Sequence, residues 1–382
     1  MSYYIQAFLL TCIVYFSIIG CYQISKAIAV VPLVWFVGVS LIYWRYGPIG
    51  QWSFYQNDQY FHWKVVVDGI GNNFNLSFDR LNYFRFPYTA AAFLISKVGI
   101  DPTLALKLTS LVCAMATISL VEKALRQAKA KQSFLSVWLT ASPILVFFSL
   151  LALRETMMAL CVTQLFLGAS QPRKMLSLLT LLILRPHLAA ALVFGLAWGW
   201  AGSRLPNRWY LPAVLATAIL PIYLGTMGFS LGNFIIYQLP LQLYQDLFLR
   251  EQVVQIFSGF LGLQFLTVAH QTVEFTTRSL LLIRVVFPEI VLVPLFFTVS
   301  CFFYTPRTTR LKLSVLATFV FFMAVSSGTE YLSVRQSLPI MPIMGFAALL
   351  SFTRPTRSNE LEGANPSFRL SSGSPKEFVE RS

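Results

Sequence analysis

Charged residues are scarce in this chain of 382 residues, where they make up only 12% of the sequence. Soluble domains carry roughly twice that fraction, so the scarcity excludes an ordinary soluble enzyme and a charge-rich disordered chain. Hydrophobic residues account for 56% of the sequence, and the mean hydropathy is +0.66. This composition is typical of a protein that crosses a membrane several times.

Cysteine and histidine are also few, with five and three residues respectively. All five cysteines fall inside apolar runs and show no metal-ligand spacing. They exclude a secreted disulfide scaffold, and we interpret them as small apolar residues. We expect no metal and no cofactor. A divalent cation stays open as an alternative, without support from the spacing of possible ligands.

Eleven apolar stretches are candidates for membrane-spanning helices, each of which needs about 20 residues. We predict an all-α transmembrane domain over 1–352 and a disordered cytoplasmic tail over 353–382. The stretches are 4–23, 27–44, 103–122, 133–151, 156–170, 175–186, 187–202, 209–229, 281–303, 312–329 and 336–352. Three alternatives stay open for the short fifth to seventh stretches: tilted pairs, re-entrant segments, or one misdivided run.

The distribution of positive charge predicts the orientation of the chain. The net charge is +14, and if the spans alternate, 17 of the 29 Lys and Arg residues fall on one side together with every basic short loop. By the positive-inside rule that side is the cytoplasm, so we expect the N-terminus outside and the C-terminus inside. The charge thus needs no nucleic-acid partner. We expect the bacterial inner membrane, with the active face outward.

Two long segments, 45–102 and 230–280, lie on the outer side in this topology. The apolar stretch 86–100 is too short to span, so we predict an interfacial helix there. The stretch 234–275 mixes apolar residues with scattered polar ones, which fits one or two amphipathic helices over the outer surface. A plain structural cap is the alternative for this second loop.

Several ionisable residues collect at the predicted outer ends of apolar helices. Arg154 and Arg185 both follow apolar runs and have no long polar loop beside them. Such residues normally face a cavity or a partner. The alternatives are a side chain that snorkels to the interface and an Arg–Glu pair that joins two helices. Glu155 is expected to pair with Arg154 rather than to act in chemistry.

An outward cavity of this kind suits sugar transfer from a lipid carrier. Arginine binds phosphate bidentately, the aromatic residues of the first outer loop can pack on sugar rings, and a carboxylate such as Asp58 can accept a proton from an attacking hydroxyl. Because nucleotide sugars are made in the cytoplasm, an outward site implies a polyprenyl-linked donor. The substrates and membrane lipid are the expected partners, with polysaccharide export or assembly proteins as further ones.

Short motifs along the chain carry a resemblance to one group of enzymes. The first outer loop holds QNDQY at 56–60 and FRFPY at 84–88, before PTLALK at 102–107. It resembles the first loop of GT-C membrane glycosyltransferases. The segments LRETMMAL at 153–160 and LRPH at 184–187 are similar to segments of bacterial O-antigen and exopolysaccharide polymerases. Residues 330–335, followed by LPIMP at 338–342, resemble the start of a late span that both groups share.

The resemblance implies roles for particular residues. Asp58 would be the general base or would orient the acceptor hydroxyl, and His187 would protonate or hydrogen-bond the leaving phosphate. The remaining candidates would bind phosphate: Arg154, Arg185, Arg335, Arg250, Arg278 and His270. Two features depart from the GT-C pattern, since two spans precede the first loop and Asn57 stands before Asp58 where a second acidic residue is usual. These departures favour the polymerase branch.

Two other classes of function compete with a polysaccharide polymerase. A transporter or flippase for a lipid-linked saccharide or another anion would share the arginines, but should show broken mid-membrane helices. The charges found lie at helix ends, which weighs against it. A non-catalytic assembly subunit explains the composition but not the arginine cluster. His62 lies four residues after Asp58, on one face if the segment is helical, and a metal site there would need more ligands.

Overall fold

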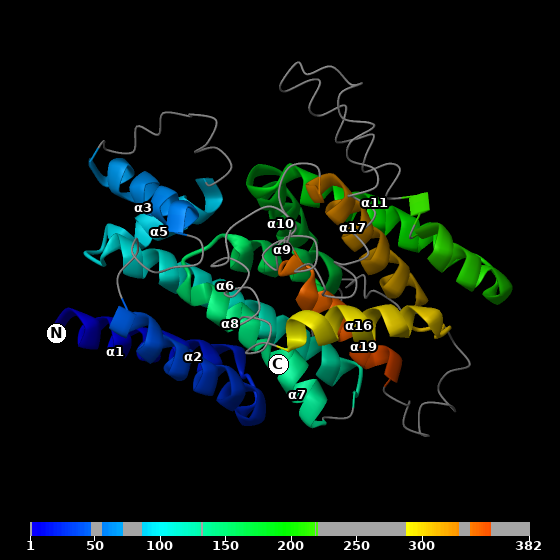
Figure 1. The fold of residues 1–382 in the computed structure, drawn as a ribbon, viewed down its shortest axis with the longest axis horizontal. Coiled ribbons are helices and arrows are strands. Elements are labelled where there is room, and N and C mark those ends of the chain that lie inside the picture. The colour runs from blue at the N-terminus through cyan, green and yellow to red at the C-terminus, as the bar shows by residue number, and fades with distance from the viewer. Residues whose placement is uncertain are drawn as a thin grey trace, which may run out of the picture.

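The structure is a computed structural model, and it describes residues 2–46, 56–71, 86–130, 133–217, 219–220, 288–327 and 337–352. Within these ranges every regular element is helical, which confirms the all-α prediction (Figure 1). The first elements are α1 (Ser2–Tyr22), α2 (Lys26–Tyr46), α3 (Gln56–Gly71), α5 (Phe86–Ser96) and α6 (Pro102–Gln127). The middle elements are α7 (Phe134–Ala141), α8 (Pro143–Leu150), α9 (Glu155–Leu167), α10 (Gln171–Leu184), α11 (Pro186–Gly202) and η1 (Asn207–Trp209). The last are α16 (Glu289–Phe302), α17 (Thr309–Ser327) and α19 (Met341–Phe352).

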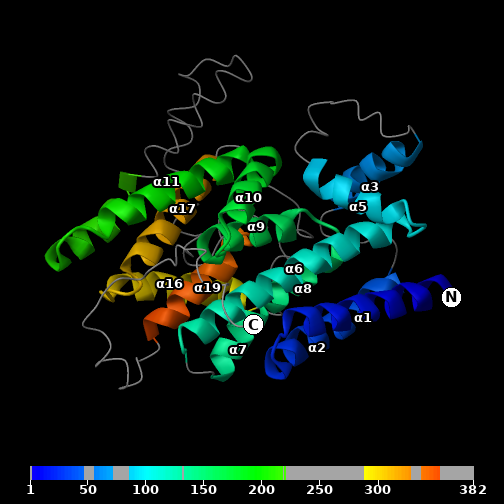
Figure 2. The same cartoon turned by 180° about the vertical axis from the view of Figure 1, so that it is seen from behind.

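Helix α6 is the longest of the described helices and packs against α1, α5, α8 and α9 (Figure 2). The side chain of Asp101 caps its start by accepting hydrogen bonds from the N–H groups of Thr103 and Leu104. Among the described residues, α6 alone is long and apolar enough to cross a membrane, with several shorter apolar helices around it.

A buried carboxylate joins the far end of α6 to the hairpin of α1 and α2. Glu122 accepts two hydrogen bonds from the backbone N–H of Ser25, at 3.0 and 3.2 Å, just before α2 begins. Arg126 lies 3.6 Å from this carboxylate and donates to the carbonyl of Gln23. Because these groups satisfy the backbone at the turn, they fix the α1–α2 hairpin against α6.

The stretch 133–151, predicted as one span, is divided into two helices. Ser142 has a left-handed backbone with φ of 41°, and Pro143 then begins α8. Glu289, at the start of α16, accepts hydrogen bonds from the backbone N–H of Ile144 at 2.5 Å and from the indole of Trp138 at 3.1 Å. The break is thus capped by a carboxylate from a distant part of the chain. The sequence did hold an indication, because a residue before proline disfavours helical backbone.

The short stretches between 156 and 202 are three separate helices, α9, α10 and α11. This outcome removes the alternative of one misdivided run. Within the segment 86–100, predicted as an interfacial helix, residues Phe86–Ser96 form the helix α5, and its side chains Tyr88, Ala92 and Phe93 are buried against the bundle. The segment after Asp58, whose helicity was left conditional, is helical as α3.

Helices α11 and α17 run antiparallel and very close together. Gly195 and Gly199 of α11 face Ser314 and Thr318 of α17, with no room for a Cβ atom at either glycine. Two small residues four apart are the usual means by which membrane helices bring their backbones together. Because the two helices are antiparallel, Arg185 at the start of α11 lies against the ring of Phe322, near the C-terminal end of α17.

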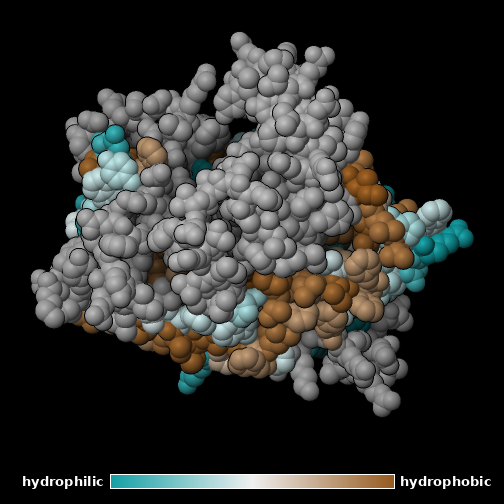
Figure 3. Space-filling view, viewed as in Figure 1, coloured by the Kyte–Doolittle hydropathy of each residue, from teal (hydrophilic) through white to brown (hydrophobic). Residues whose placement is uncertain are grey.

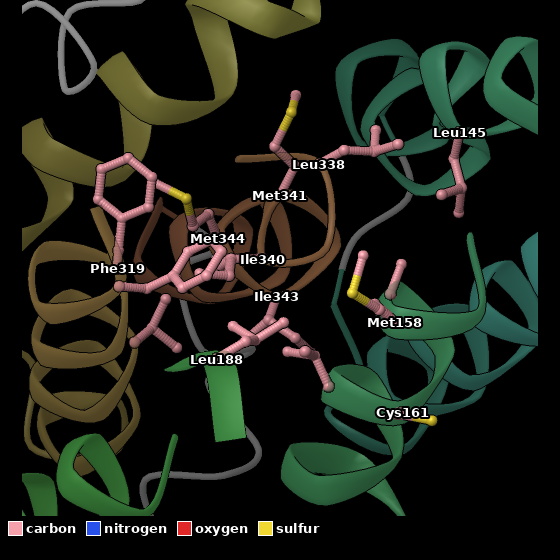
Figure 4. Close-up of a cluster of buried hydrophobic side chains, with 14 of the residues drawn as sticks. Leu145, Met158, Cys161, Leu188, Phe319, Leu338, Ile340, Met341, Ile343 and Met344 are labelled. Carbon is pink, nitrogen blue, oxygen red and sulfur yellow. The ribbon is translucent and has the colours of Figure 1, made fainter. Parts of the chain in front are cut away.

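Helix α19 lies in the main core and is buried from Met341 to Leu349. A helix that is apolar on all sides belongs in such a position. Figure 4 shows its start between α9, α11 and α17, with Met158, Leu188 and Phe319 of these helices around Ile340, Ile343 and Met344.

Apolar side chains also lie exposed on the outside of the bundle at helical spacing. On α1 these are Leu9, Ile13 and Phe16, and on α10 they are Met175, Leu176, Leu179 and Leu182. Figure 3 shows broad hydrophobic areas on the described part of one face. Contiguous exposed apolar patches of this kind mark contact with lipid or with other proteins.

Candidate functional site

A short turn between α8 and α9 forms the centre of the candidate site. It covers residues 151–154, and Ala152 within it adopts a left-handed backbone with φ of 51°. That conformation is unfavourable for a residue with a Cβ atom, so the turn needs support from its surroundings. The turn ends at Arg154, directly before α9.

Arg154 connects this turn to the end of α10. Its Nη1 donates a hydrogen bond to the carbonyl oxygen of Leu184, 3.2 Å away. This carbonyl belongs to the last turn of α10, where helix carbonyls lack partners within the helix. The sequence left open a snorkelling side chain or an ion pair. The observed contact places a cation on the C-terminus of a neighbouring helix, which suits the helix dipole.

Arg185 is the residue between α10 and α11, with a non-helical backbone at φ of −161° and ψ of 85°. Its side chain is 8% exposed, and the guanidinium carbon lies 5.3 Å from the centre of the Phe322 ring. His187 follows in the first turn of α11 and is half-buried. Because Arg154 bonds to residue 184, the structure brings the two predicted LR segments together at one place.

The N-termini of α9 and α11 both begin at this place. Glu155 occupies the first position of α9 and is fully buried. Helix N-termini carry partial positive charge, and at α9 the carboxylate of Glu155 stands in the first turn, where a negative charge is favourable.

Helix α3 reaches the same turn through His62. The ring nitrogen Nδ1 lies 3.2 Å from the carbonyl oxygen of Ala152, and the side chain is 1% exposed. Asp58 stands one helical turn before His62 in α3. The helix that carries the predicted general base is therefore attached to the turn that ends in Arg154.

A buried polar network extends from His62 into α5 and α6. The rings of His62 and Tyr88 meet edge to face, with centres 5.2 Å apart. The Tyr88 hydroxyl donates to the carbonyl of Leu106 and lies 2.7 Å from the hydroxyl of Ser110. Ser110 in turn donates to the carbonyl of Leu153, at 3.2 Å. Sequence reasoning missed Ser110, because it lies in an apolar stretch far from residue 153, and included Tyr88 only as the last residue of the FRFPY segment.

Four predicted site residues lie outside the described residues: Arg250, His270, Arg278 and Arg335. The loop 230–280 and the tail 353–382 also lie outside them. Arg335 is bounded by α17, which ends at Ser327, and by residue 337, where the description resumes before α19. Helices α17 and α19 contact each other in the bundle.

Among the described residues, no group of three or more His, Cys, Asp or Glu side chains could hold a metal ion. Compared with known protein families, curated proteins and solved structures, the chain shows no match.

Proposed function

We propose that this protein is an integral membrane glycosyltransferase of the polysaccharide-polymerase kind. It would act on saccharides linked to a polyprenyl phosphate or pyrophosphate at the outer face of a bacterial inner membrane. The observation that carries the proposal is the meeting of Arg154 and the Leu184–Arg185 junction at one point, with α3 attached to the same turn by His62. This arrangement supports a phosphate-binding region next to the helix that holds Asp58.

The surface supports the membrane part of the proposal. Exposed apolar stripes on α1 and α10 are costly in water but match the interior of a bilayer. The close α11–α17 packing through Gly195 and Gly199 is of the kind that membrane helices use. We therefore place a bundle of about 11 spans in the membrane, with loop 45–102 outside and the tail inside.

This topology is tested by cysteine labelling in a background without native cysteines. Val98 is 78% exposed in the turn after α5, and Lys129 lies in the turn after α6. We expect Val98→Cys to react with a membrane-impermeant maleimide in intact cells, and Lys129→Cys to react only after the cells are opened. The reverse result would place the proposed site in the cytosol and end the proposal.

The proposed reaction is a substitution at the anomeric carbon of the donor sugar. The acceptor hydroxyl oxygen forms a bond to this carbon while the bond from the carbon to the carrier's phosphate oxygen breaks. The hydroxyl proton passes to the carboxylate of Asp58, and the bonding electron pair leaves with the phosphate. Arg154 and Arg185 would stabilise the leaving charge, and His187 would donate a hydrogen bond to it.

The test is made in cells that depend on this chain for their polymer. We expect Asp58→Ala, Arg154→Ala and Arg185→Ala to abolish long polymer while single lipid-linked repeat units are still made. Arg173→Ala is the matched control, because Arg173 is exposed at the opposite end of α10. Normal polymer in all three variants, at wild-type protein levels, would refute the site assignment.

One observation favours a transporter as the second candidate function. The helix break at Ser142 places a helix N-terminus within a predicted span, with Glu289 against it. In the predicted span 281–303, Glu289 lies inside the span and not at its end. For this carboxylate the expectation that charges lie at span ends is therefore wrong. Broken helices and buried carboxylates are typical of transport sites. Uptake of a lipid-linked saccharide into liposomes, lost in Glu289→Gln and without any bond formation, would favour transport over transfer.

A further inference from the structure

We propose that His62 is a positioning residue that sets the place of α3, and hence of Asp58, relative to the Arg154 turn. The inference rests on the proposed function for its catalytic consequence, but its structural part stands independently. His62 is not needed as a ligand or a base in this scheme. Its role is to hold α3 at a fixed position relative to the turn at residues 151–154.

In the hydrogen bond between His62 and Ala152, the imidazole ring of His62 is the donor. A carbonyl oxygen can only accept, so at 3.2 Å the Nδ1 atom of His62 must carry the proton. The bond joins residues 90 positions apart in the sequence and is buried. Because water cannot replace a lost partner there, removing the donor leaves the Ala152 carbonyl unsatisfied.

The Ala152 carbonyl belongs to the strained part of the turn, and other side chains hold the next carbonyl. Ser110 of α6 donates to the carbonyl of Leu153, and Thr156 of α9 donates to it at 3.3 Å. With Ala152 held in a left-handed conformation, three side chains from three helices therefore determine the course of the turn. Of these, His62 alone comes from α3.

The other end of the turn is held separately. Arg154 stays attached to the carbonyl of Leu184 on α10 through a contact that does not involve α3. Loss of the His62 bond should therefore detach α3 from the turn, leaving its packing on α5 and α6 and leaving Arg154 in place. In kinetic terms the turnover number should fall, while the KM for the lipid-linked donor should change little.

Four variants of the full-length protein separate the hydrogen bond from ring packing. His62→Phe keeps a ring beside Tyr88 but removes the donor. His62→Asn places an amide N–H near the position of Nδ1, whereas His62→Gln places it near Nε2. Lys64→Ala is the matched control, because Lys64 is exposed on the same helix.

Hydrogen–deuterium exchange of the purified protein tests the structural part without any substrate. We expect His62→Phe and His62→Gln to raise the exchange rates of both α3 and residues 151–156 by about tenfold or more, the effect of losing one buried hydrogen bond. His62→Asn and Lys64→Ala should match the wild type. Equal exchange in the Phe and Asn variants, whether both fast or both normal, would overturn the inference.

The transfer assay, with a synthetic polyprenyl-pyrophosphate-linked oligosaccharide as donor, tests the catalytic part. We expect His62→Phe to lower kcat at least tenfold with KM within about threefold of the wild type, and His62→Asn to restore kcat. A wild-type kcat in His62→Phe would refute the positioning role. If the wild-type protein itself makes no product, the proposed function fails, and the exchange experiment still decides whether His62 joins α3 to the turn.

Discussion

Adding one methyl group to Gly199 should destabilise the protein, whereas the same change at Gly38 should not. A Cβ atom at Gly199 would lie 2.6 Å from the carbonyl oxygen of Arg310 and 2.8 Å from the backbone nitrogen of Ser314. At Gly38 of α2, nothing lies within 4 Å of the added atom. Both changes replace glycine by alanine within a helix, so both gain the same helix propensity of up to about 1 kcal/mol.

The difference between the two variants therefore isolates the packing of α11 on α17. Since the obstructing atoms belong to the backbone of α17, the helices must separate by about half an ångström or more. Overpacking of this kind typically costs about 1–3 kcal/mol. For a chain of 382 residues the unfolding entropy is roughly 0.8 kcal/mol/K, which makes the expected difference in Tm about 1–4 °C.

The measurement is thermal unfolding of the purified protein in detergent, followed by tryptophan fluorescence. Gly195→Ala should behave like Gly199→Ala, because a Cβ atom there would lie 2.5 Å from the carbonyl oxygen of Ser314. Adding Ser314→Ala to Gly199→Ala should not restore stability, since the backbone contacts remain. Equal Tm values for Gly199→Ala and Gly38→Ala would refute close helix packing as the reason for these glycines.

Three further substitutions test other buried contacts by the same unfolding measurement. Lys312→Met should lower the free energy of unfolding by about 1–3 kcal/mol, because the buried ammonium donates to the carbonyls of residues 300 and 303 at the end of α16. A variant as stable as the wild type would show that these carbonyls need no donor. Glu122→Ala should cost about 1 kcal/mol through loss of the cap at Ser25, and the exposed neighbour Lys123→Ala should be neutral. Ala152→Gly should stabilise the protein by up to about 1 kcal/mol, since glycine adopts a φ of 51° without steric cost; a loss of stability would mean that the turn is not strained.

The sequence by itself determined the class of the fold and the approximate ends of most helices. Long apolar runs and the turn residues between them are local properties, and helix formation depends on local backbone geometry and hydrogen bonding. For that reason α6, α9, α10 and α11 lie close to the predicted stretches. Two features were not predicted, the helix break at Ser142–Pro143 and the close packing at Gly195 and Gly199, although the residues that cause them are local in the sequence.

Only the tertiary structure decided which helix ends meet. The contact between Arg154 and Leu184 spans 30 residues, and the contact between His62 and Ala152 spans 90. No periodicity along the chain encodes such a pairing, because it results from how all the helices share one buried volume. The same reason explains Glu289, which in the fold caps a helix that begins 146 residues earlier, at Pro143.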